Sequence, residues 1–144
     1  MTTPTINPQA LPIRTLHCAN RTLYAAVVLA VLGVCIYAAL APGPAYRPPL
    51  AIAAGIISLI WGGGYASLSY TISPQGITRS IFFILKRRYT WQNLGPAEFH
   101  CIDAPGERSV SLIFNGITLS GELLDPDSLE SLSDDLRTAG LLKN

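Results

Sequence analysis

The chain has 144 residues, of which 49% are hydrophobic and 13% charged, and its mean hydropathy is +0.36. Soluble domains carry about 25% charged residues, so this composition argues against a wholly water-soluble protein and against a disordered one. Three cysteines are too few for a disulfide-stapled scaffold. Residues 1–97 hold seven basic residues and no acidic one, whereas all nine acidic residues lie at or after Glu98.

The first part of the chain contains two apolar segments without charged residues. They predict helices over residues 22–41 and 49–68, joined by a proline-rich loop at 42–48. About 20 helical residues extend roughly 30 Å, the thickness of the hydrocarbon core of a bilayer. We therefore predict a transmembrane hairpin over residues 22–69. The alternatives are a buried helical pair in a soluble protein and a cleaved signal peptide; the long apolar core and Pro42 argue against cleavage.

Lysine and arginine near the segment ends predict the orientation of the hairpin. Arg14 and Arg21 precede the first segment and four cations at 79 and 86–88 follow the second, whereas the loop holds Arg47 alone. The positive-inside rule then places both chain ends in the cytoplasm, with the hairpin in the inner (plasma) membrane. Neither segment contains Asp, Glu, Lys, Arg or His, which disfavours a pump or a proton-coupled transporter.

Small residues repeat along both segments and predict a helix-packing face or a surface for a partner helix. They are Ala26, Ala30 and Gly33 in the first segment and Ala54, Ser58 and Gly62 in the second. The plainer explanation is that alanine and glycine are common in membrane helices.

Beyond residue 69 the spacing of apolar residues changes from the period of a helix to that of a strand. We divide the chain into an N-terminal cytoplasmic segment (1–21), the hairpin (22–69) and a cytoplasmic domain (70–144). The N-terminal segment is either disordered or adds one strand at 11–18. The domain is predicted to contain six short antiparallel strands, at 67–73, 77–82, 87–93, 98–102, 110–114 and around 117–119. A capping helix follows over about 126–139, with Asp125 as its N-cap.

Three stretches of this domain resemble the bacterial PH-like (pleckstrin-homology-type) small membrane proteins. They are YTISPQGITRS from Tyr70, RRYTWQNLG from Arg87 and DPDSLESLSDDLRTAG from Asp125. The matching positions are Tyr70, Gly76, Arg87, Arg88, Trp91 and Leu94. The resemblance implies a membrane α+β fold, in which a two-helix transmembrane hairpin is followed by a small antiparallel PH-like β-barrel or sheet with a C-terminal capping helix. A full PH barrel has seven strands, one more than the six expected here, and residues 11–18 are the candidate for the seventh.

The sequence contains no recognisable catalytic constellation. Its only histidines are His17 and His100, and each is followed directly by a cysteine, Cys18 and Cys101 respectively. Neighbouring residues on a strand point to opposite faces, so these pairs do not suit a metal ion that needs converging ligands. No phosphate-binding glycine loop or nucleophile motif is present. We expect no enzymatic activity, no metal or cofactor, no nucleic-acid partner and no small-molecule substrate.

The most distinctive stretch of the domain is an apolar turn beside three consecutive cations. Its residues are predicted to contact the membrane, where each juxtamembrane cation gains about 1 kcal/mol near anionic lipid. The predicted interface comprises Phe82, Phe83, Ile84, Lys86, Arg87 and Arg88. Alternatively, the apolar residues fill the core and the cations form a solvated edge.

The C-terminal helix carries an acidic face that is the candidate surface for a protein partner. The face comprises Glu130, Asp134 and Asp135. An ordinary solvated helix face would have the same composition.

Together these patterns predict a non-enzymatic integral inner-membrane protein that presents a PH-like domain for binding proteins or lipid headgroups. Its expected partners are membrane lipids and either another membrane protein or a second copy of itself, as for an accessory or assembly subunit of a membrane complex. The alternatives are a membrane immunity or stress-response protein and, less favoured, a transporter component.

Overall fold

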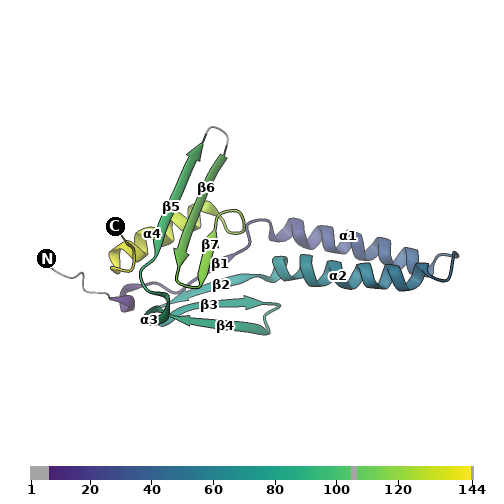
Figure 1. The fold of residues 1–144 in the computed structure, drawn as a ribbon, viewed down its shortest axis with the longest axis horizontal. Helices are drawn as coiled ribbons and strands as arrows, with labels where there is room; N and C mark the ends of the chain where they lie inside the picture. The colour runs from purple at the N-terminus through teal and green to yellow at the C-terminus, as the bar shows by residue number, and fades with distance from the viewer. Residues whose placement is uncertain (1–6, 105–106, 144) are drawn as a thin grey trace.

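The computed structural model describes residues 7–104 and 107–143. Two long helices, α1 (Arg21–Leu40) and α2 (Arg47–Ser67), lie side by side and extend from a domain of two antiparallel sheets and a C-terminal helix (Figure 1). Both helices are long and apolar enough to cross a membrane. In each helix only 6% of the most apolar stretch is buried, whereas the core helix of a soluble protein is mostly buried.

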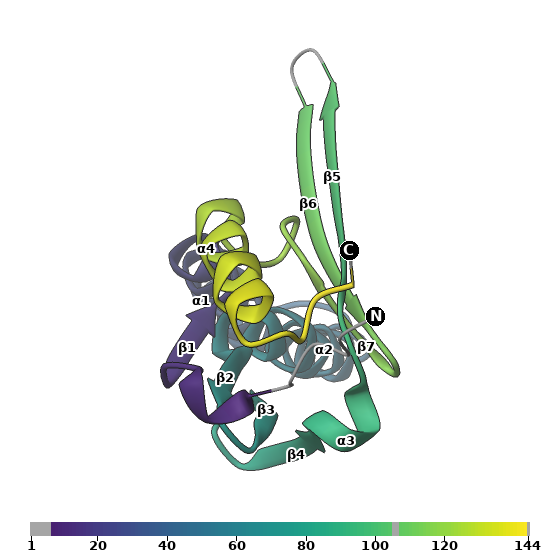
Figure 2. The same cartoon turned by 90° about the vertical axis from the view of Figure 1, so that its left-hand side faces the viewer.

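The domain contains seven strands in the described residues, in two sheets of order β1-β2-β3-β4 and β5-β6-β7. The strands are β1 (Arg14–His17), β2 (Ser69–Ser73), β3 (Gly76–Ile81), β4 (Leu85–Thr90), β5 (Glu98–Ala104), β6 (Glu107–Phe114) and β7 (Ile117–Ser120). Three helical segments complete it: η1 (Pro8–Ala10), α3 (Trp91–Leu94) and α4 (Pro126–Thr138). The β5–β6 hairpin projects away from the rest of the domain in both views (Figures 1 and 2).

The helical pair is inserted between two neighbouring strands of one sheet. β1 leads into α1, and β2 follows α2 directly. β1 pairs antiparallel with β2, with His17 opposite Ser69 and Arg14 opposite Ile72. Both helices therefore leave the domain from the same end of the same sheet, and the ladder between β1 and β2 fixes their separation at that point.

A single hydrophobic core joins both sheets to α4. Its fully buried side chains come from every layer, and each contributes about 1.5–3 kcal/mol through burial. They include Ile72 and Ile77 of the first sheet, Leu112 and Leu119 of the second, and Leu129 and Leu136 of α4. The C-terminal helix thus holds the two sheets together.

The predicted start of the C-terminal helix is confirmed. Asp125 caps α4, because its carboxylate accepts a hydrogen bond from the Ser128 backbone N–H at 3.0 Å. Pro126 occupies the first helical position, where the missing N–H breaks no intrahelical bond. Leu132 lies on the same buried stripe as Leu129 and Leu136.

The predicted strand at 87–93 is wrong in its second half. β4 ends at Thr90, and Trp91–Leu94 forms the short helix α3. Trp91 and Leu94 are both buried at the spacing of one helical turn, which a strand cannot place on one face. The Trp91 indole N–H also donates to the Ser73 carbonyl at 3.0 Å. This bond anchors α3 against the end of β2.

The helical pair packs through a different set of small residues from the one predicted in α1. Val28 is the buried residue of α1, and its Cγ2 would lie 2.3 Å from a Cβ placed on Gly62 of α2. A Cβ on Gly55 would lie 3.6 Å from the Cβ of Cys35. By contrast, Ala26, Ala30 and Gly33 are exposed, as is Ala54, while Ser58 is half-buried. Glycine in α2 thus allows the close approach, whereas the predicted small residues of α1 do not pack on α2, and their role toward a partner helix stays a prediction.

Candidate functional site

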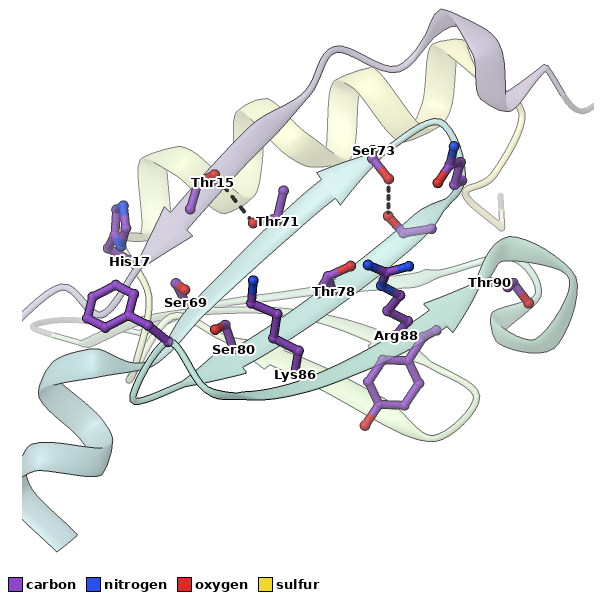
Figure 3. Close-up of a pocket in the computed structure, with 14 residues that line it drawn as sticks. Thr15, His17, Ser69, Thr71, Ser73, Thr78, Ser80, Lys86, Arg88 and Thr90 are labelled. Carbon is purple, nitrogen blue, oxygen red and sulfur yellow. Dashed lines mark hydrogen bonds between the residues drawn. The ribbon is translucent and has the colours of Figure 1, made fainter. Parts of the chain in front are cut away.

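One face of the first sheet carries polar side chains in two rows across all four strands. The face opposite the core includes one row formed by Thr15, Thr71, Thr78 and Arg88, and a second row formed by His17, Ser69, Ser80 and Lys86. These residues line a shallow depression of about 620 Å³ (Figure 3). We call this surface the polar face.

The polar face has hydroxyl groups at its centre and two cations on one edge. Thr15 Oγ1 and Thr71 Oγ1 lie 3.4 Å apart, and Ser73 Oγ donates to the Gly76 carbonyl at 3.1 Å. Within the described residues, neither Lys86 nor Arg88 forms an ion pair. Hydroxyl and cationic donors together suit an anionic, oxygen-rich group.

The turn between β3 and β4 is docked on the end of α2. The Phe82 backbone N–H donates to Ser67 Oγ at 2.9 Å, and the same hydroxyl donates to the Gly63 carbonyl at 2.7 Å. A Cβ on Gly63 would lie 3.1 Å from the Phe82 ring, so glycine there makes room for the aromatic side chain. The β3–β4 hairpin therefore runs back toward α2, and its turn is held against the C-terminal end of that helix (Figure 1).

The backbone of this turn is strained. Phe82 and Phe83 have φ of 53° and 58°, in the left-handed region that side chains with a Cβ avoid. Each such residue costs about 1–2 kcal/mol. The Phe82 contacts with α2 offset part of this cost, whereas Phe83 is 64% exposed and gains little from packing. An exposed aromatic residue held in a strained turn is typical of a contact surface.

The structure divides the six residues of the predicted membrane interface among four locations. Phe83 and Ile84 are exposed at the tip, as is Leu85 beside them. Lys86 and Arg88 line the polar face, whereas Arg87 lies on the other side of β4, with its guanidinium 5.4 Å from the Tyr89 ring centre. Phe82 is half-buried against α2 and does not point outward with the tip.

The acidic face of α4 is engaged within the chain. Asp135 forms an ion pair with Arg14 at 3.2 Å, and Arg14 also donates to Ser131 Oγ at 2.7 Å. Glu130 pairs with Arg108, and Asp134 pairs with Arg137 at 3.2 Å. Arg14 thereby ties β1 to α4. A role for this face toward a partner stays a prediction.

The two His-Cys dipeptides lie in different surroundings. His17 lines the polar face while Cys18 is buried, and Cys101 is exposed on β5. His100 lies 3.8 Å from Glu98, whose pKa is lowered by a hydrogen bond from Lys143. In the part of the chain that the structure describes, no three His, Cys, Asp or Glu side chains come together as metal ligands.

Sequence reasoning missed two parts of the site. The alternating Ser and Thr of β2 predicted a half-buried strand, but the rows of the polar face depend on register across four strands, which the sequence does not show. The sequence indicates only that Arg79 is one of the cations that predict the orientation of the transmembrane hairpin. Its partners across the sheet, Tyr70 and Arg87, also depend on strand register.

No family model, no curated protein and no solved structure matches this chain. The resemblance to PH-like membrane proteins stays a prediction.

Proposed function

We propose that this chain is a non-enzymatic integral membrane protein of the inner membrane, with the sheet domain and both chain ends in the cytoplasm. The observation that carries the proposal is the exposure of two adjacent helices, each long and apolar enough to cross a membrane. Their exposed side chains are the large apolar ones, such as Leu29 and Val34 of α1 and Ile56 of α2. A bilayer would cover this surface, whereas water would not.

The arrangement of seven strands, four and three to a sheet, before one C-terminal helix supports a PH-like domain. The segments that follow the helical pair provide six strands, and β1 provides the seventh that a PH barrel needs. In this proposal the transmembrane hairpin occupies the connection between the first two strands of the PH-like fold.

The proposed activity is binding at the membrane surface. The β3–β4 hairpin runs along the end of α2, so the exposed tip of Phe83, Ile84 and Leu85 lies at the height where a membrane-spanning α2 would enter the headgroup layer. Lys86, Arg87 and Arg88 follow immediately, and cations at this height attract anionic headgroups. Two spanning helices already secure attachment, so the hairpin acts by orienting the domain and by contacting lipid.

An oriented domain suits an accessory or assembly subunit. Docking of the β3–β4 turn on α2 and insertion of the helices into one sheet hold the polar face at a fixed angle to the helix axes. A membrane partner approaching from the side would then meet the same polar face on every copy.

The test removes the three cations together. Lys86→Ala/Arg87→Ala/Arg88→Ala should leave the protein in the membrane fraction, since the helices are unchanged. It should abolish the protection from protease that vesicles of phosphatidylglycerol and phosphatidylcholine give the β3–β4 hairpin, because about 1 kcal/mol per cation is lost.

Arg137→Ala/Lys143→Ala provides the control, because it removes cations from the end of the chain and should keep the protection. Release of the triple variant from the membrane fraction would contradict the two-span assignment. Unchanged protection of its hairpin would contradict the headgroup contact.

A further inference from the structure

We propose that the groove between α2 and the β3–β4 hairpin binds one anionic phospholipid, with its phosphate at Arg79 and an acyl chain along α2. The inference rests on the proposed membrane insertion and adds a specific site to it. The groove has a volume of about 330 Å³. It lies between Ile60, Trp61 and Gly64 of α2 and Arg79, Phe82 and Leu85 of the hairpin.

Arg79 forms the cationic end of the groove, and Arg87 lies across the sheet from it without lining the groove. Arg79 lies directly opposite Arg87 on β4 and opposite Tyr70 on β2. Like charges facing each other across a sheet destabilise it unless an anion lies between them. Among the described residues neither arginine forms an ion pair, and the chain has no acidic residue before Glu98.

Arg79 also has an unused hydrogen-bond donor. Its Nε is buried and has no hydrogen-bond partner among the described residues. An unpaired buried donor is costly, and a guanidinium suits a phosphate because it donates two parallel hydrogen bonds. Burial raises the pKa of the neighbouring Tyr70 hydroxyl, so this group stays protonated. A phosphate oxygen would satisfy the donor and reduce the repulsion between the arginines.

The other end of the groove is apolar and continues the surface of α2. Ile60 and Trp61 are mostly exposed on α2, and Leu85 is exposed on the facing strand. Ile60 lies about two turns before the end of α2, whereas Arg79 belongs to the sheet beyond that end. The groove therefore changes from apolar to cationic in the direction that a lipid changes from acyl chain to phosphate. This order favours a lipid over a peptide or a second copy of the chain.

Binding is measured by native mass spectrometry on the full-length chain in mild detergent, titrated with phosphatidylglycerol or phosphatidylcholine. We expect one phosphatidylglycerol per chain, retained in preference to phosphatidylcholine and not displaced by millimolar inorganic phosphate. Arg79→Gln should weaken retention about tenfold or more, the effect of one charged hydrogen-bonding group. Arg137→Gln is the control: it removes the same charge from α4, outside the groove and outside the predicted membrane interface, and it should keep the lipid.

A second variant tests the apolar end without changing charge. A Cβ on Gly64 has space, with its nearest neighbour in Phe82 3.9 Å away, so Gly64→Leu should fold and fill the groove. It should also lose the lipid. Equal retention in Arg79→Gln and Arg137→Gln, equal retention of both lipids, or an unaffected Gly64→Leu would overturn the lipid site. These outcomes leave membrane insertion standing, whereas recovery of the protein without detergent would remove the premise itself.

Discussion

Gly76→Ala is expected to unfold the sheet domain or to lower its unfolding free energy by about 3 kcal/mol or more. Gly76 has φ of +148°, which L residues rarely adopt. A Cβ there would lie 1.9 Å from the Tyr89 carbonyl oxygen, which belongs to the neighbouring strand and cannot rotate away. Thermal unfolding of the detergent-solubilised protein, followed by the fluorescence of the buried Trp91, measures the change.

Gly116→Ala is the matched control for backbone strain without a clash. Gly116 also has a positive φ, of +91°, but nothing lies within 4 Å of the position that an added methyl group would take. Its replacement by alanine should lower the free energy of unfolding by only about 1 kcal/mol. If the two variants unfolded at the same temperature, the close approach of Gly76 to β4 would be wrong, and with it the register of the β3–β4 hairpin.

Gly62→Ala is expected to push α1 away from α2, and Val28→Ala to restore the pairing. The added methyl group would overlap Val28 Cγ2, and overpacking of this kind costs about 1–3 kcal/mol. Val28 is β-branched and has few rotamers with which to avoid the contact. The effects of the two substitutions on the free energy of helix pairing should therefore be strongly non-additive.

A disulfide provides the readout of this pairing. In a Gly55→Cys variant with Cys18 and Cys101 replaced by serine, the new Cβ lies 3.6 Å from that of Cys35, within disulfide range. Gly62→Ala should slow oxidation of this pair, and Val28→Ala/Gly62→Ala should restore its rate. Gly33→Ala, which adds a methyl group where nothing lies within 4 Å, should leave the rate unchanged. A Gly62→Ala variant that oxidises at the original rate would contradict the close helix approach.

The elements that could be predicted from sequence are those with a local signal. The two apolar segments, the N-cap at Asp125 and the buried leucine stripe of α4 each depend on residues within a few turns of one another. The two-residue turn at Asn115-Gly116 also follows from local chemistry, and Phe114 indeed pairs with Ile117 across it. The boundaries of the long helices agree within two residues.

The elements that sequence reasoning missed depend on distant segments. The alternation of Tyr89 and Trp91 fits a strand, and only contact with the β2 carbonyl at Ser73 shows that the chain turns into α3. Small residues occur on two faces of α1, and the position of Val28 against Gly62 decides which face packs. Likewise, the pairing of Arg79 with Arg87 follows from register, which the order of cations along the chain does not contain.

The central claim is that both helices cross the membrane and leave the sheet domain on the cytoplasmic side. Labelling of single-cysteine variants with a membrane-impermeant thiol reagent in spheroplasts tests it most directly. One variant keeps only Cys101, which is exposed on β5, and the other carries only Ala45→Cys in the exposed loop between α1 and α2. We predict that Ala45→Cys is labelled in intact spheroplasts and that Cys101 is labelled only after lysis; labelling of Cys101 before lysis, or of both positions alike, would contradict the claim.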